Sequence, residues 1–244
     1  MKIIEVDTYE QMSLKAAELI ANRLKEKEKF VLGLATGGTP EGAYKLLIEW
    51  NKAKKLTFAH VTSFNLDEYI GLDRENPSSY YYFMMDNLFN HVDIDRNMIH
   101  IPNGLAADLD EECARYETAI ASAGGIDLQL LGIGQNGHIA FNEPGTSFDS
   151  KTHIIELTPS TREVNARFFD DPNEVPSQAI TMGIDSIMQS KELLLLASGK
   201  EKADAMKQLI EGEITETFPA SALKQHTRFT IIADKAALSK VKWS

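Results

Sequence analysis

The feature that most constrains the fold is a regular alternation of short apolar runs with longer amphipathic segments along the 244 residues. Residues 30–35 and 192–197, rich in Leu, Val and Ala, predict buried strands, and residues 9–25, with apolar side chains at helical spacing, predict a helix. This alternation predicts an α/β fold: a doubly wound, Rossmann-like, mostly parallel sheet with helices on both faces. No repeat or flexible linker divides the sequence, so we expect residues 1–244 to form a single domain.

Other elements follow from the same patterns. Further strands are predicted at residues 3–6, 61–66, 126–131, 153–157, 178–182 and 229–233. Further helices are predicted to begin at residues whose side chains can cap them: Thr39, Ser78 or Ser79, Asp108 and Asp234.

Composition limits the possible partners and the compartment. A net charge of −11 argues against nucleic acid or an anionic membrane as a general partner, so an anionic ligand needs local positive charge. Cys113 is the single cysteine, which excludes an internal disulfide and favours the reducing cytoplasm. No signal peptide and no apolar run long enough to span a bilayer is found.

Ligands of doubly wound sheets bind outside the carboxyl ends of strands, and the candidate residues follow predicted strands. The first loop contains Thr36, Gly37, Gly38 and Thr39 between a buried strand and a helix. Its backbone amides and the helix N-terminus can bind an anion, and a phosphate group is the expected ligand. The Gly-Lys-Ser/Thr ending of a P-loop is absent, and a plain tight turn is the alternative.

The second loop places two carboxylates, Asp67 and Glu68, directly after a predicted strand. In an extended chain they point in opposite directions, so one of them can face a cleft. A carboxylate in a partly desolvated cleft can remove a proton from a carbon next to a carbonyl. The alternative is a helix cap or a solvated acidic turn.

The third loop places His138 and Glu143 after another predicted strand. Histidine moves protons near neutral pH, and a carboxylate within reach fixes its tautomer and raises its basicity. A buried structural histidine is the alternative. Glycines at 132, 134 and 137 match the dinucleotide fingerprint, but residues 139–141 are predicted to continue extended and not to open a helix, which argues against that function.

Two basic residues complete the candidate site. Arg167 follows a polar segment, and Lys202 comes shortly after the predicted strand at 192–197. Either cation could neutralise a phosphate on an otherwise acidic protein. Surface Lys and Arg are common, so each is weak evidence by itself.

Taken together, four motifs resemble the glucosamine-6-phosphate deaminase (glucosamine-6-phosphate isomerase) family. They lie at residues 33–40, 64–69, 134–144 and 165–169, in that family's order. The resemblance implies hydrolytic deamination and isomerisation of D-glucosamine 6-phosphate to D-fructose 6-phosphate and ammonia, in amino-sugar catabolism, without a cofactor or metal.

The resemblance also implies residue roles. Asp67 would move the C2 proton to C1, and His138 would open the sugar ring. Glu143 and Asn136 would form the relay around His138; many members have Asp at the latter position. The remaining matched residues would bind the substrate phosphate: Thr36, Gly37, Gly38, Thr39, Arg167 and Lys202.

Assembly and two other function classes remain open. Larger members of the family are hexamers whose allosteric pocket uses basic residues, and the aligned positions here are His153 and Ile155. We therefore expect a monomer or small homo-oligomer and no hexamer. The alternatives are a related sugar-phosphate enzyme, of the 6-phosphogluconolactonase or pentose-phosphate isomerase type, and a non-catalytic sugar-phosphate sensor.

Overall fold

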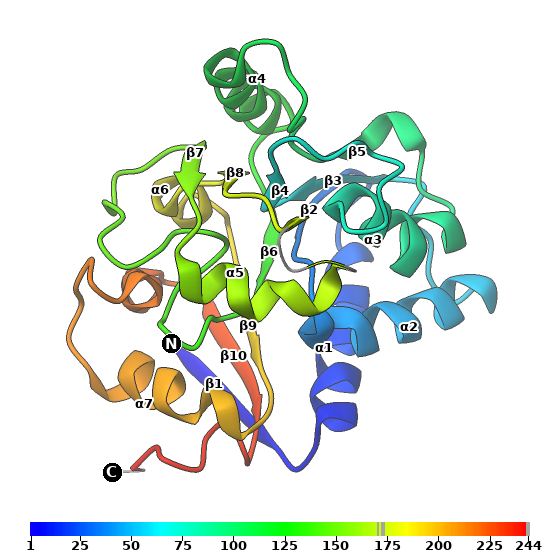
Figure 1. Cartoon of the computed structure of the whole chain (residues 1–244). Helices are drawn as coiled ribbons and strands as arrows, with labels where there is room; N and C mark the ends of the chain where they lie inside the picture. The colour runs from blue at the N-terminus through cyan, green and yellow to red at the C-terminus, as the bar shows by residue number, and fades with distance from the viewer. Residues whose placement is uncertain (170, 172–173, 243–244) are drawn as a thin grey trace.

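A seven-stranded sheet runs through the centre of the molecule (Figure 1). The structure, a computed structural model, describes residues 1–169, 171 and 174–242. The strands of this sheet are β1 (Lys2–Val6), β2 (Phe30–Leu34), β3 (Val61–Asn65), β5 (Ile99–His100), β6 (Leu128–Leu131), β9 (Leu193–Ala197) and β10 (Phe229–Asp234). They lie in the order β1-β10-β9-β6-β2-β3-β5, and every neighbouring pair is parallel. The predicted parallel α/β architecture is confirmed.

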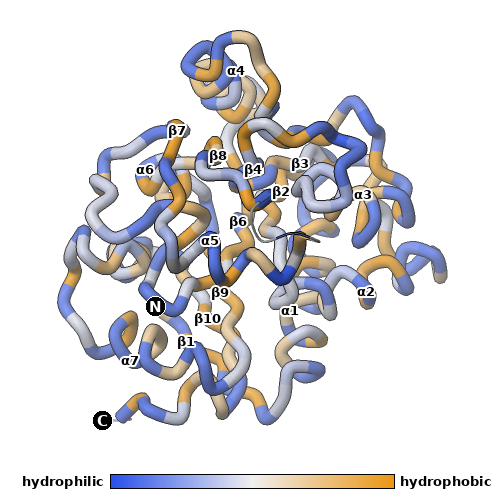
Figure 2. Tube along the Cα trace, viewed as in Figure 1, coloured by the Kyte–Doolittle hydropathy of each residue, from blue (hydrophilic) through white to orange (hydrophobic). Residues whose placement is uncertain are grey.

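Helices cover both faces of this sheet because its strands are apolar on both sides. On one face, Leu194 and Leu196 pack with residues of α1 (Tyr9–Leu24), α2 (Gly38–Lys52) and α3 (Tyr80–Asn87). On the other, Leu193 and Leu195 pack with residues of α4 (Leu109–Ser122), α6 (Ile184–Met188) and α7 (Ala203–Glu211). Figure 2 shows apolar strands between helices that are polar on their outer sides. Short 3-10 helices span Phe89–His91, Arg96–Met98, Ala166–Phe168, Lys200–Lys202 and Pro219–Gln225.

A second, antiparallel sheet lies beside the carboxyl end of the first. It contains β4 (Asp67–Tyr69), β8 (Gln178–Thr181) and β7 (His153–Glu156), in that order. The strands at 153–156 and 178–181 were predicted from their composition, but their place outside the parallel sheet was not. Helix α5 (Pro159–Asn165), which follows β7, was not predicted either. Its seven residues are too few to show a helical period clearly.

The order of the strands fixes where a ligand can bind. The chain adds β3 and β5 on one side of β2, then crosses to the other side and adds β6 and β9. Between β2 and β6 the loops at the carboxyl ends therefore leave in opposite directions and open a crevice. The loops predicted to hold a phosphate and to carry His138 follow these two strands.

Two predicted helix caps are confirmed and two are wrong. Ser79 and Asp108 cap α3 and α4 with their side chains. Thr39 is not a cap, because the helix already begins at Gly38. The N-cap is Gly37, whose φ of 90° suits glycine and not a residue with a branched side chain. Asp234 opens no helix: within the described residues 235–242 the chain forms turns. Its buried carboxylate accepts from the Ala237 N–H in the first of these turns and from Ser198 and Gly199 in the loop that follows β9.

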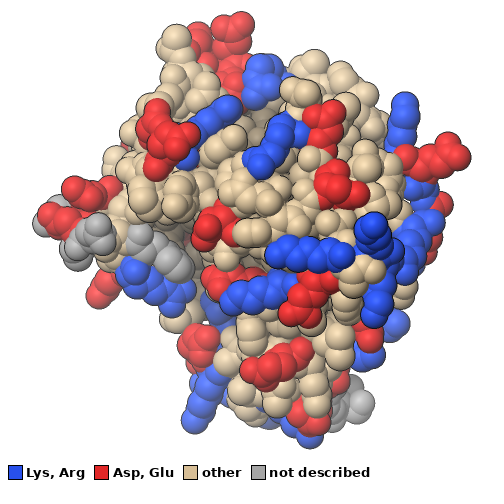
Figure 3. All heavy atoms as spheres, turned by 90° about the vertical axis from the view of Figure 1, so that its right-hand side faces the viewer, with Lys and Arg blue, Asp and Glu red and all other residues tan. Residues whose placement is uncertain are grey.

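The outer surface carries charges of both signs. On the face that Figure 3 turns to the viewer, Lys and Arg side chains are interspersed with Asp and Glu. Within the part of the chain that the structure describes, no helix is long and apolar enough to cross a membrane.

The hydroxyl of Tyr116 fastens α4 to the carboxyl ends of β3 and β5. This fully buried side chain donates to the Asn65 carbonyl at 2.7 Å, and the His100 carbonyl lies 3.1 Å away. Tyr116→Phe should lower the free energy of unfolding by about 1–2 kcal/mol, because a buried acceptor loses its donor. Urea titration measures this, with Tyr82→Phe, at a 40% exposed position, as a near-neutral control. Equal midpoints for the wild type and Tyr116→Phe would contradict the assigned role.

Candidate active site

A cleft of about 780 Å³ opens at the carboxyl ends of the central strands. It is lined by segments that follow β2, β3, β6 and β9 and by residues of α3 and α5. Nine of the ten residues predicted from the sequence line it: Thr36, Gly37, Gly38, Thr39, Asp67, Asn136, His138, Arg167 and Lys202. The tenth, Glu143, is 5% exposed and lies behind His138.

Asp67 lies where the chain leaves the parallel sheet and enters the antiparallel one. It follows β3 by two residues and begins β4, where it pairs with Thr181 of β8. Its side chain is 6% exposed, and burial, together with the nearby charge of Glu68, raises its pKa to about 8. Once ionised, a carboxylate in these buried surroundings is a much stronger base than a carboxylate in water.

Glu68 points away from the cleft and anchors α3. Its carboxylate accepts hydrogen bonds from the backbone N–H groups of Tyr69, Tyr80 and Tyr81 at 2.8, 2.9 and 2.8 Å. Burial still raises its pKa, to about 7, although these bonds act in the opposite direction. Both interpretations offered for this acidic pair therefore hold, each for one residue: Glu68 caps a helix, and Asp67 faces the cleft.

An aromatic wall that sequence analysis missed adjoins Asp67. The ring of Tyr80 lies 4.8 Å from that of Tyr69 and stacks at 5.9 Å on that of Phe141. Tyr80 and Phe141 both line the cleft. No pattern distinguishes Tyr80 from Tyr81 and Tyr82 in the sequence, so only the fold could show which of them faces the cleft.

The loop that carries His138 is tightly folded. The Gly134 N–H donates to the His138 carbonyl at 2.9 Å, and a Cβ on Gly134 would lie 2.4 Å from the His138 ring. Gly137 has a φ of 84°. The prediction that residues 139–141 continue extended is wrong, because Ala140 has a φ of 51° within a turn. As predicted, no helix follows these glycines; Gly134 makes room for the imidazole ring.

Glu143 holds its charge beside that ring. His138 Nδ1 lies 3.7 Å from Glu143 Oε2, longer than a hydrogen bond but close enough for ion pairing when the ring is protonated. Asn136 Nδ2 donates to the same oxygen at 2.8 Å, while Asn136 Oδ1 accepts from the backbone N–H of His138 at 3.2 Å. Burial favours the neutral form of Glu143, but the His138 ring, Thr161 and Asn136 outweigh it and lower its pKa to about 2.

Another part of the cleft is suited to an anion. Helix α2 begins there, and no side chain caps its first amides. The hydroxyl of Tyr9 fixes this turn by donating to the Gly38 carbonyl at 2.8 Å and accepting from the Gly42 N–H at 2.9 Å. Lys202 Nζ donates to the Ile133 carbonyl at 2.8 Å. Burial and the charge of Arg167 lower the pKa of Lys202, as expected where two cations share a site.

This arrangement can transfer protons on a small phosphorylated molecule. It combines a buried carboxyl group, an imidazole with an ionised partner and an anion site in one cleft. Among the described residues, no group of three His, Cys, Asp or Glu side chains is placed to hold a metal ion.

Comparison with known proteins agrees with this geometry. A family model described as glucosamine-6-phosphate isomerases/6-phosphogluconolactonase matches residues 5–232. A glucosamine-6-phosphate deaminase from Halalkalibacterium halodurans is 58% identical, with 99% of this chain and 98% of the relative covered. One from Oceanobacillus iheyensis is 56% identical, with 100% and 97% covered.

Solved structures show the same likeness. A structure described as a monomeric glucosamine-6-phosphate deaminase superposes with a TM-score of 0.97 at 52% identity, covering 98% of this chain and 100% of that one. A 6-phosphogluconolactonase from Thermotoga maritima, 22% identical with a TM-score of 0.76 over 96% of this chain and 99% of its own, shares the fold. The chain therefore belongs to the glucosamine-6-phosphate isomerase/6-phosphogluconolactonase family.

Proposed function

We propose that this protein is a glucosamine-6-phosphate deaminase that converts D-glucosamine 6-phosphate and water to D-fructose 6-phosphate and ammonia. The observation that carries the proposal is the buried carboxyl group of Asp67 in the same cleft as His138 and an anion site. Relatives 56% to 58% identical over nearly the whole chain bear this name. Release of ammonia from glucosamine 6-phosphate by the purified protein is the direct test.

Ring opening is the first step, and we assign it to His138. The imidazole takes the proton of the C1 hydroxyl and returns a proton to the ring oxygen as the bond between C1 and that oxygen breaks. Glu143 stabilises the imidazolium that forms in between, because its low pKa keeps it charged. The product is an open-chain aldehyde at C1.

Isomerisation and deamination follow. The aldehyde makes the C2 proton acidic, and the carboxylate of Asp67 removes that proton while the C1 oxygen takes up a proton from solvent, which gives an enolamine. Asp67 then delivers its proton to C1, which leaves a protonated imine at C2 and a hydroxyl at C1. Water adds to this imine carbon, and ammonia leaves as the proton taken from solvent is returned. A base shielded from water suits this task, since hydration would weaken it.

The substrate phosphate would sit against the start of α2. Thr36, Gly37, Gly38 and Thr39 supply the turn, and Arg167 and Lys202 supply positive charge. These six residues line the same cleft as Asp67 and His138, so a phosphate bound by them can accompany C1 and C2 placed at those two side chains. The lactonase alternative uses no base for carbon deprotonation, and a sensor needs no proton-transfer groups, so both leave Asp67 unexplained.

The proposal extends to organisation and setting. We infer that residues 1–244 act as one catalytic domain, because both sheets contribute to the cleft. We infer a monomer, as the solved relative with 52% identity is described. A role in amino-sugar catabolism follows from the reaction, and a cytoplasmic setting rests on the single cysteine, Cys113.

Asp67→Asn should abolish turnover while leaving substrate binding largely intact. The amide keeps the shape of the side chain but cannot accept the proton, which typically lowers the rate by about 10²–10⁴. Exchange of the C2 hydrogen with deuterated solvent, followed by NMR, should be lost together with ammonia release. Undiminished exchange in the variant would show that another residue is the base.

The same substitution should stabilise the fold in a pH-dependent way. The pKa of Asp67 is about 8 in the folded protein and about 3.9 when unfolded, so ionisation is less favourable in the folded state. The wild type should lose stability relative to Asp67→Asn as the pH rises from about 4 to about 8, with a constant difference above that. Denaturant titrations across this range measure it. A difference that shrinks with rising pH would contradict the raised pKa.

Lys202→Ala and Arg167→Ala should each weaken substrate binding by roughly 1.5–3 kcal/mol, because each removes a charge-assisted bond to phosphate. The values of kcat/KM for glucosamine 6-phosphate measure the loss. Lys200→Ala is the matched control, since Lys200 lies on the same 3-10 helix but is exposed and does not line the cleft. An equal loss with free glucosamine as substrate would count against phosphate binding.

A further inference from the structure

The two oxygens of the Glu143 carboxylate have separate sets of partners. Oε2 faces Asn136 and the His138 ring. Oε1 points the other way and accepts a short hydrogen bond from the hydroxyl of Thr161. The hydroxyl of Thr158 lies 3.2 Å from the same oxygen. A carboxylate bonded on one side only could rotate, so the contacts to Oε1 determine where Oε2 points.

The two threonines form a chain of hydroxyls. Thr158 Oγ1 lies 3.1 Å from Thr161 Oγ1, and it also accepts from the Thr161 N–H at 3.3 Å as the N-cap of α5. A hydroxyl has one proton to donate, and Thr161 directs its own to Glu143. Thr161 is 4% exposed, so water competes little for that proton. Buried chains of this kind strengthen each bond through polarisation.

We propose that Thr161, supported by Thr158, is a positioning residue that holds Glu143 in the orientation needed to stabilise the His138 imidazolium. The inference rests on the proposed function and adds a residue that acts through Glu143. The lowered pKa of Glu143 supports it, because the Thr161 hydroxyl is one of the groups that outweigh burial. Without that hydroxyl, Oε1 would keep only its longer contact to Thr158, and the carboxylate would hold its charge and its direction less firmly.

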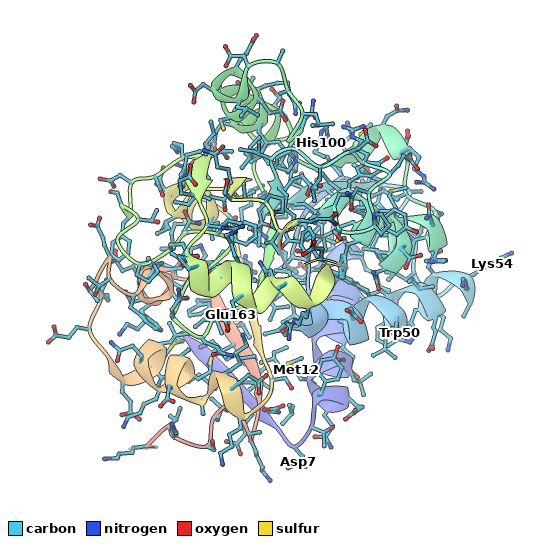
Figure 4. All side chains as sticks on the ribbon, in the orientation of Figure 1. Asp7, Met12, Trp50, Lys54, His100 and Glu163 are labelled. Carbon is cyan, nitrogen blue, oxygen red and sulfur yellow. The ribbon has the colours of Figure 1, made fainter. Side chains whose placement is uncertain are left out.

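Helix α5 carries Thr161 along the wall of the cleft. Thr161, Val164 and Asn165 lie on one face of the helix and line the cleft, whereas Glu163 lies on its exposed side (Figure 4). Arg167 lies in the 3-10 helix that directly continues α5. One short segment therefore carries both the support of Glu143 and a proposed phosphate ligand.

Thr161→Val removes the hydroxyl but keeps the shape of the side chain. We expect kcat for glucosamine 6-phosphate to fall about tenfold, the loss typical of one hydrogen bond to a charged group, with little change in KM. Thr161→Ser, which retains the hydroxyl, should stay within about threefold of the wild type. In a Glu143→Gln background, Thr161→Val should have almost no further effect, because its partner charge is already gone.

Thr146→Val is the matched control. The Thr146 hydroxyl donates to the backbone carbonyl of Glu143 at 2.7 Å and does not contact the carboxylate. It should leave kcat within about twofold of the wild type, as for a partly exposed neutral hydrogen bond. An unchanged kcat in Thr161→Val, or a full tenfold loss that persists in the Glu143→Gln background, would overturn the proposal. Thr161→Ala serves as the second hydroxyl-free variant should Thr161→Val not fold.

A spectroscopic measurement separates this inference from the proposed function. In the free protein labelled with ¹⁵N-histidine, Thr161→Val should shift the His138 ring signals at fixed pH, whereas Thr161→Ser and Thr146→Val should not. If the wild type releases no ammonia, the proposed function fails and these signals still decide the role of Thr161. If ammonia is released but the ring signals of Thr161→Val match those of the wild type, the positioning role alone is wrong.

Discussion

The chemistry proposed for the cleft depends on keeping one carboxyl group, that of Asp67, out of water. The chain achieves this by ending a buried parallel strand and pairing the next residues with a strand of a second sheet. Glu68 secures the junction through three backbone N–H groups, two of them at the start of α3. The dry surroundings that make Asp67 a strong base also make its charge unfavourable, so activity and stability oppose each other at this residue.

The pKa values of two buried carboxyl groups in one site are shifted in opposite directions, and hydrogen-bond donors make the difference. Burial acts on Asp67 and Glu143 in the same direction. Asp67 has the charge of Glu68 beside it, and its pKa rises to about 8. Glu143 receives bonds from Asn136 and Thr161 beside an imidazole, and its pKa falls to about 2. Such a separation suits one group to exchanging protons and the other to remaining charged.

A protein with a net negative charge needs positive groups inside its binding site to hold a phosphate ester. The net charge of −11 repels anions at long range, but salt screens such repulsion beyond about 10 Å. The proposed local ligands are the first turn of α2 and the cations Arg167 and Lys202, which line the cleft together with Glu201. Asp234 contributes indirectly, since its carboxylate holds Ser198 and Gly199 at the start of the loop that leads to Lys202.

The sequence by itself determined the parallel sheet, most element boundaries and the loops that meet at its carboxyl edge, because these follow from local periodicity and from strand direction. It also singled out His138 and the pair Asp67 and Glu68 as groups suited to proton transfer, and the family resemblance named Asp67 of that pair. Only the tertiary structure decided that residues 153–156 and 178–181 form a separate sheet, that Ala140 turns the His138 loop, and that the Thr161 hydroxyl reaches Glu143. Strand pairing, the dryness of Asp67 and the direction of a carboxylate arise from contacts between residues distant in sequence, and no local pattern encodes them.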